Sequence, residues 1–204
     1  LAVLGLVRCD DEDIPRSVLR EKDGRISSFA NTDRKREDAW TFSGIQWISR
    51  ELCGSLPPSG CLVADLYAHF LAEGRVVGVP LHGYWADIGT VSRLHEVHMD
   101  LLRQPELLKL VRPEFGRDME GPGIAKHPGV EIGPDVSILP PCVLDEGVQV
   151  GKGAKLGPSV YAGAGSRIGA GAQISEVVVL EGTEVAGREG KCVLWCEGAV
   201  KVLS

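Results

Sequence analysis

The sequence predicts an incomplete α/β domain followed by a parallel β-helix. In the first part of the chain, strand-like apolar runs alternate with amphipathic helical stretches, which is the pattern of an α/β domain. From Val130 onward, apolar residues recur every six positions, and a short fixed period of this kind is typical of a β-solenoid. We therefore place the α/β part at 1–112, a linker containing Pro and Gly at 113–129, and the β-helix at 130–204.

The α/β part is expected to contain two helices and five strands. One helix is predicted at Leu62–Glu73, with Gly74 as its stop, and the other at Ser92–Arg103. The opening apolar run is too short to span a bilayer and lacks the basic residues of a signal peptide. We interpret it as a buried strand entered in mid-domain, and the chain as a piece of a longer protein. The strand-like runs are Leu1–Val7, Arg25–Phe29, Trp40–Ile48, Val76–Pro80 and His82–Ile88.

The repeat region predicts a narrow prism whose interior is filled by regularly spaced side chains. Each hexad is interpreted as one short strand and a turn, and nine hexads would make about three coils. No single coil buries much surface, so stability is expected from the stacking of neighbouring coils. A second inward column of small or branched residues is expected at every sixth position from Val136 to Val178. The main apolar column is Ile132, Ile138, Leu144, Val150, Leu156, Ala162, Ile168, Ile174 and Leu180.

Composition excludes several classes of partner. The 204 residues include 22 Lys and Arg against 28 Asp and Glu, which gives a formal net charge of −6. An acidic chain without a basic stripe is a poor nucleic-acid binder, because neutralisation of phosphates dominates that affinity. No stretch approaches the roughly 18 consecutive apolar residues of a membrane span. The six cysteines lack the pairing of a disulfide framework, so we expect free thiols and a cytoplasmic location.

The segment 83–90, Gly-Tyr-Trp-Ala-Asp-Ile-Gly-Thr, is the strongest candidate for chemistry. It is expected to lie at the end of a strand and to lead into the helix that starts at Ser92. A carboxylate at Asp87 could hold a divalent cation over a sugar phosphate, since Mg²⁺ prefers carboxylate oxygens and often shares its coordination sphere with substrate phosphates. The alternative is that Asp87 only caps the turn before the helix.

Four segments, in this order along the chain, resemble the sugar-1-phosphate nucleotidyltransferases (NDP-sugar pyrophosphorylases). Asp23–Phe29 resembles the family's D-G-R-[IV]-x-x-F strand, and Thr41–Ile45 resembles the F-[ST]-G-[IV] form of its sugar-pocket segment. Gly74–Gly78 resembles the strand before the closing motif, and Trp85–Thr90 the closing motif itself. The resemblance implies part of a Rossmann-like nucleotidyltransferase domain followed by a left-handed parallel β-helix, as in mannose-1-phosphate guanylyltransferase-like and ADP-glucose pyrophosphorylase-like members.

The resemblance also implies roles for particular residues. Asp87 would be the catalytic aspartate that helps bind Mg²⁺ near the sugar phosphate, with Trp85 beside it, while Ser43 and the backbone of Gly44 would contact the sugar. The family usually has Glu-Lys after the residue matched by Phe29, and that lysine contacts the sugar phosphate; this chain has Ala-Asn-Thr there. Among Arg34, Lys35 and Arg36, we take Arg34 as the candidate replacement, with a solvated loop as the alternative reading.

The implied reaction transfers a nucleotidyl group from a nucleoside triphosphate to a sugar 1-phosphate and releases pyrophosphate. The family's glycine-rich phosphate loop and its other metal-binding aspartate are absent from the sequence. We therefore expect this chain to supply the sugar side of the site, to be inactive by itself, and to form homo-oligomers through its repeats.

Two other functions stay open. A non-catalytic regulatory or scaffold subunit is favoured by the missing Glu-Lys pair. A hexapeptide-repeat acyltransferase would need a histidine base in or beside the coils, whereas none of the five histidines falls inside Ile132–Leu180.

Overall fold

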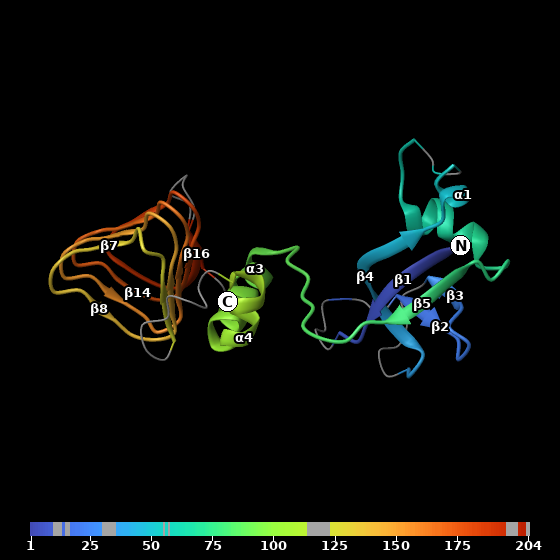
Figure 1. Cartoon of the computed structure of the whole chain (residues 1–204), viewed down its shortest axis with the longest axis horizontal. Helices are drawn as coiled ribbons and strands as arrows, with labels where there is room; N and C mark the ends of the chain where they lie inside the picture. Colours follow the sequence, from blue (N-terminus) through green and yellow to red (C-terminus); the bar gives the residue numbers. More distant parts are fainter. Residues whose placement is uncertain are drawn as a thin grey trace. The chain divides into compact units, whose positions relative to one another are not determined.

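The chain forms two compact units, Leu1–Asp87 and Ile88–Ser204, which are described separately (Figure 1). The predicted helix at Ser92–Arg103, which the sequence analysis counted with the α/β part, therefore falls in the second unit. The division of the chain at 112 and 129 stays a prediction, and residues 114–122 of the expected linker lie outside the described residues. The computed structural model describes residues 1–9, 14, 17–29, 36–54, 56, 58–113, 123–194 and 200–202.

The first unit is built on a five-stranded mixed sheet with the order β3-β2-β4-β1-β5. The central strand β1 pairs antiparallel with β4 and parallel with β5. This sheet confirms the predicted α/β class, although β2 was not expected, and the predicted strand at His82–Ile88 is wrong because residues 81–89 form irregular chain. The strands are β1 (Ala2–Val7), β2 (Val18–Arg20), β3 (Ile26–Phe29), β4 (Ala39–Ile48) and β5 (Val76–Pro80).

Short helices cover the apolar face of this sheet. They are α1 (Arg50–Cys53), the π-helical turn η1 (Leu62–Tyr67) and α2 (Ala68–Phe70). Leu66 and Tyr67 are buried against Leu4 and Leu6 of β1, in one hydrophobic cluster. The predicted helix at Leu62–Glu73 is thus present as η1 followed by α2. In the described part of the chain, no helix is long and apolar enough to cross a membrane.

The second unit contains a parallel β-solenoid of about four turns. Glu131, Gln149 and Arg167 are neighbours in one ladder, so the chain returns to the same face every 18 residues, which is three hexads. The strands are β6 (Ile124–Lys126), β7 (Glu131–Ile132), β8 (Ser137–Ile138), β9 (Cys142–Leu144), β10 (Gln149–Val150), β11 (Lys155–Leu156), β12 (Val160–Ala162), β13 (Arg167–Ile168), β14 (Gln173–Val179), β15 (Glu184–Val185), β16 (Arg188–Leu194) and β17 (Val200–Val202), which pairs antiparallel with β16.

The predicted inward columns form most of the solenoid core. Leu144, Val150 and Ile168 are at most 4% exposed and belong to one cluster with Cys142 and Val160. The first coil differs, because Ile132 is 40% exposed and the other inward residues there are only partly buried. Burial of the column therefore depends on a stacked coil on each side, as expected for a solenoid.

At two glycines of the repeat, glycine is required because adjacent coils lie close together. A Cβ atom on Gly151 would lie 2.6 Å from the backbone nitrogen of Ala170 in the next coil, and one on Gly163 would lie 2.9 Å from the nitrogen of Glu181. Neither glycine has a positive φ, so steric exclusion explains them rather than conformational freedom.

One corner of the solenoid is a residue short, and this shifts the inward register. Leu156 pairs with Ile174, yet Val160 pairs with Val177, so the turn between these two faces has one residue fewer in the later coil. The strand β14 consequently runs through the corner. Val177 and Val179 fill the interior, whereas Val178 points outward. The predicted inward positions of Val178 and Leu180 are therefore wrong.

Two helices pack on one outer face of the solenoid, α3 (Val91–Arg103) and α4 (Pro105–Val111) (Figure 1). The expected helix at Ser92–Arg103 is confirmed as α3, but α4 was not predicted. Met99, Leu102 and Leu108 lie against a ladder of outward-facing residues on successive coils. That ladder is Ala125, Val143, Tyr161, Val178 and Val193.

Candidate functional site

The sugar-pocket segment lies at a β-bulge in the first unit. The pairing of β1 with β4 shifts between Leu4 and Leu6, so extra residues of β4 bulge opposite Gly5. The Ser43 hydroxyl donates to the Gly5 carbonyl at 2.8 Å and accepts from the Ile45 N–H at 3.2 Å. Gly44 is exposed with φ +85°, a conformation that favours glycine. The bulge is therefore fixed by Ser43 and leaves the Gly44 backbone open to solvent.

Trp85 joins the closing motif to this bulge. Its indole N–H donates to the Ser43 carbonyl at 3.1 Å, across 42 residues of sequence. Residues 81–89 carry no helix or strand, so this hydrogen bond and the partial burial of the ring hold the segment against β4. The structure thus brings together three of the predicted site residues, Ser43, Gly44 and Trp85.

Asp87 lies two residues beyond Trp85 and is exposed. It is not the N-cap of the following helix, because the N-cap of α3 is Thr90, whose hydroxyl accepts from the Arg93 N–H at 3.2 Å. Among the described residues, no group of three or more His, Cys, Asp or Glu is arranged to hold a metal ion. Asp87 is therefore not part of a described metal cluster, and its role as a Mg²⁺ ligand stays a prediction.

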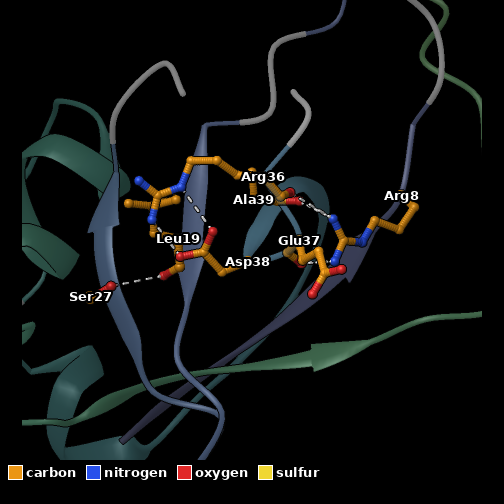
Figure 2. Close-up of polar contacts among 7 residues, drawn as sticks. All are labelled: Arg8, Leu19, Ser27, Arg36, Glu37, Asp38 and Ala39. Atoms are coloured by element: carbon orange, nitrogen blue, oxygen red, sulfur yellow. Dashed lines mark hydrogen bonds and ion pairs between the residues drawn. The ribbon is translucent and has the colours of Figure 1, made fainter. Parts of the chain in front are cut away.

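The cation that would replace the family lysine is not identified. Arg34, the predicted residue, lies outside the described residues, as does Lys35. Arg36 forms a two-pronged ion pair with Asp38, with N–O distances of 2.9 and 2.6 Å (Figure 2). Because of this pair, the Arg36 side chain is already occupied where the structure describes it.

Arg8 is a cation at the end of β1 that the sequence analysis did not consider. Its guanidinium donates to the Ala39 carbonyl at 2.7 Å and to the Glu37 carbonyl (Figure 2). It also lies 4.0 Å from the centre of the Trp40 ring. These contacts fix the turn that leads into β4. The role of Arg8 in the structure is therefore to anchor that turn.

The Asp-Gly-Arg motif at 23–25 forms a tight turn beside β5. The Asp23 carboxylate accepts from the Arg25 backbone N–H at 3.0 Å and from its side chain at 2.7 Å. The backbone N–H of Arg25, and then its guanidinium, hold the pKa of Asp23 below its ordinary value. The Gly24 carbonyl accepts from the Gly78 N–H at 2.8 Å, so the turn also supports β5 just before the closing motif.

A buried polar cluster in the second unit was also missed by the sequence analysis. Arg112, which follows α4, donates to both carboxylate oxygens of Asp145 at 2.8 Å, and the Tyr161 hydroxyl donates to the same carboxylate at 3.0 Å. Burial raises the pKa of Asp145, but the Glu146 N–H and the Arg112 guanidinium outweigh it, so the net pKa is lowered. Burial and the neighbouring carboxylate raise the pKa of Tyr161 to about 12. The only sequence signal was a polar residue, Asp145, directly after the apolar run Cys142–Leu144.

No protein-family model matches the chain. It is 47% identical over 47 residues to a glucose-1-phosphate adenylyltransferase of Bacillus cytotoxicus, a segment that covers 22% of this chain and 12% of that enzyme. It is 42% identical over 36 residues to the enzyme of the same name from Clostridioides difficile, covering 18% and 9% of the two chains. Over a short segment, then, the chain is similar to sugar-phosphate nucleotidyltransferases, and it carries the β-solenoid expected of their hexapeptide-repeat members.

Proposed function

We propose that this chain forms the sugar-binding side of a sugar-1-phosphate nucleotidyltransferase. The observation that carries the proposal is the hydrogen bond from Trp85 to the Ser43 carbonyl. This hydrogen bond brings the closing motif into contact with the sugar-pocket segment, as a substrate site shared by the two motifs requires. The short matches to glucose-1-phosphate adenylyltransferases support the same class of reaction.

In this reaction an oxygen of the sugar phosphate attacks the α-phosphorus of the nucleoside triphosphate. A new P–O bond forms, the bond between the α- and β-phosphates breaks, and pyrophosphate leaves with the electron pair. Catalysis of this kind depends on positioning and on neutralising charge. Because these relatives are glucose-1-phosphate adenylyltransferases, glucose 1-phosphate and ATP are favoured over mannose 1-phosphate and GTP as the substrates.

Each candidate residue has a role that follows from its position. The open Gly44 backbone and the bulge fixed by Ser43 would accept the sugar ring, whose hydroxyls bind well to exposed peptide groups. Trp85 would keep the following loop in place. Asp87, exposed and not used as the helix cap, would face the phosphate together with Mg²⁺, which would offset the phosphate charge when bound. We also propose that the protein forms a homo-oligomer and is located in the cytoplasm.

Calorimetric titration of glucose 1-phosphate into the 204-residue chain, with and without Mg²⁺, tests the proposal. We expect binding that Mg²⁺ strengthens, and we expect Asp87→Asn to remove most of the Mg²⁺ effect and weaken binding by about tenfold or more, roughly 1.4 kcal/mol. Glu21→Gln is the control, because it removes an exposed carboxylate from a different turn. Mannose 1-phosphate in place of glucose 1-phosphate tests the choice of sugar.

Two results would contradict the proposal. If Asp87→Asn binds the sugar phosphate with the wild-type Mg²⁺ dependence, Asp87 is not a metal or phosphate residue. If the folded wild-type chain binds neither sugar phosphate, a non-catalytic scaffold role replaces the proposed one.

A further inference from the structure

A partly open cavity lies in the second unit, between helices α3 and α4 and strand β12 of the solenoid. Its volume is about 200 Å³. An engineered protein cavity of about 150 Å³ with an apolar lining stays dry and binds benzene, so this space is large enough for a small ring compound. Most of the lining is aliphatic. The lining residues are His98, Leu101, Leu102, Leu108, Val111, Arg112 and Tyr161.

The one formal charge in the lining is already neutralised. Arg112 holds the Asp145 carboxylate in a two-pronged contact, with both distances 2.8 Å. The Asp145 side chain is only 6% exposed, so this pair is largely removed from water. An anion could bind Arg112 tightly only by displacing Asp145, which would leave a buried carboxylate without its partner. The cavity therefore favours an uncharged occupant.

Two aromatic rings form one wall of the cavity. The His98 and Tyr161 rings are 4.9 Å apart between centroids and inclined at 58°. The His98 Nδ1 donates to the Leu94 carbonyl at 2.7 Å, which leaves Nε2 as the acceptor of a neutral imidazole. Burial lowers the pKa of His98, which favours this neutral form. Rings at such angles and distances pack well against a further aromatic ring.

We propose that this cavity binds a small, neutral aromatic molecule of about the size of indole. The bound ring would contact both helices and β12 at once, so it would stabilise the docking of α3 and α4 on the solenoid. The proposal concerns the second unit alone and does not depend on the proposed nucleotidyl transfer.

The experiment uses the complete 204-residue chain, with indole as the neutral probe and benzoate as the anionic one. Methyl NMR spectra and thermal melting are recorded during each titration. We expect indole to shift methyl signals of Leu101, Leu102 and Leu108 saturably and to raise Tm by about 3–5 °C at roughly ten times its Kd. Benzoate should bind at least about tenfold more weakly.

Filling the cavity should abolish this response. Leu101→Phe and Val111→Phe each place a ring in the lining and should weaken indole binding by about tenfold or more while circular dichroism stays unchanged; two variants are used in case one fails to fold. Leu110→Phe is the matched control. Leu110 is on α4, as Val111 is, but it is 76% exposed and does not line the cavity. The proposal is overturned if wild type shows no saturable response to indole, if both filled variants keep it, or if benzoate binds as tightly as indole.

Discussion

At the scale of single residues, side chains that hydrogen-bond to backbone groups fix local structure in both units. The Ser43 hydroxyl donates to one backbone group and accepts from another, so it fixes a bulge that the β4 ladder alone would not specify. His95 is 4% exposed and donates to the Glu176 carbonyl at the short solenoid corner, at 2.7 Å. Because that ring is buried and bonded to backbone, it is badly placed to act as the base of an acyltransferase.

Thr183, in contrast, has a buried polar group without a hydrogen-bond partner among the described residues, and its cost can be tested. This group is its hydroxyl, which lies in the solenoid. Thr183→Val keeps the shape and removes the unpaired group, so we expect a gain of about 1 kcal/mol, or roughly 2–4 °C in Tm. Thr90→Val is the matched control, since the Thr90 hydroxyl caps α3 and its loss should cost about 1 kcal/mol. Equal melting shifts in the two variants would show that Thr183 is paired after all.

At the scale of elements, an apolar ladder and the Arg112–Asp145 ion pair hold α3 and α4 on the solenoid. The ladder of outward residues, from Ala125 to Val193, buries the inner side of α3 and α4. Part of this contact was hidden in the sequence, because His95, which is buried on α3 together with Met99 and Leu102, is polar. The helix α4 was missed because Pro105 reads as a break, although proline is well suited to the first turn of a helix.

The Arg112–Asp145 pair should make the docking of α4 depend on pH. The pKa of Asp145 is lowered in the folded protein, so its contribution to stability is present above the unfolded pKa of about 3.9 and is lost as pH falls through the folded pKa. We expect Asp145→Asn to cost about 1–3 kcal/mol at pH 7, because it leaves Arg112 without its charged partner. The difference from wild type should shrink below about pH 4, where Asp145 begins to be protonated in the unfolded chain and, at lower pH, in the folded protein.

Urea unfolding at several pH values measures this dependence. The control is Asp38→Asn, which removes an ion pair whose side chains are 50% and 42% exposed and should change stability by less than about 1 kcal/mol. A cost for Asp145→Asn that is the same at pH 3 and pH 7 would rule out the electrostatic explanation.

At the scale of the molecule, the hydrophobic period predicted more of the fold than the local secondary-structure propensity of each segment did. The six-residue period identified the solenoid and most of its interior, because every coil repeats the same environment. The period failed at the corner between Ile174 and Val177, where the turn is one residue shorter. After this corner, the residues expected to face the interior face outward instead. Nothing in the sequence marks the shortened turn. The candidate site was predicted as separate motifs. That Trp85 contacts the Ser43 carbonyl could not be predicted, because it depends on how an irregular loop folds back over a bulge.

The first coil of the solenoid favours self-association of the chain. In the described part of the chain, strands β6, β7 and β8 of the first coil each pair with only one neighbour, so no described strand covers their other edges. Beside these edges Ile132 is 40% and Leu139 54% exposed. Exposed strand edges with apolar side chains favour self-association. We therefore expect the chain to form oligomers through its first coil.

Light scattering coupled to size-exclusion chromatography measures the mass of each variant. The double variant Ile132→Lys with Leu139→Lys should dissociate the oligomer and leave the circular dichroism spectrum unchanged, because each added charge would have to be desolvated at the contact. Leu110→Lys is the control, since Leu110 is 76% exposed but lies on α4 and not on a strand of the first coil. Dissociation by Leu110→Lys alone would move the interface to the helices, and a monomeric wild type at high concentration would remove the interface altogether.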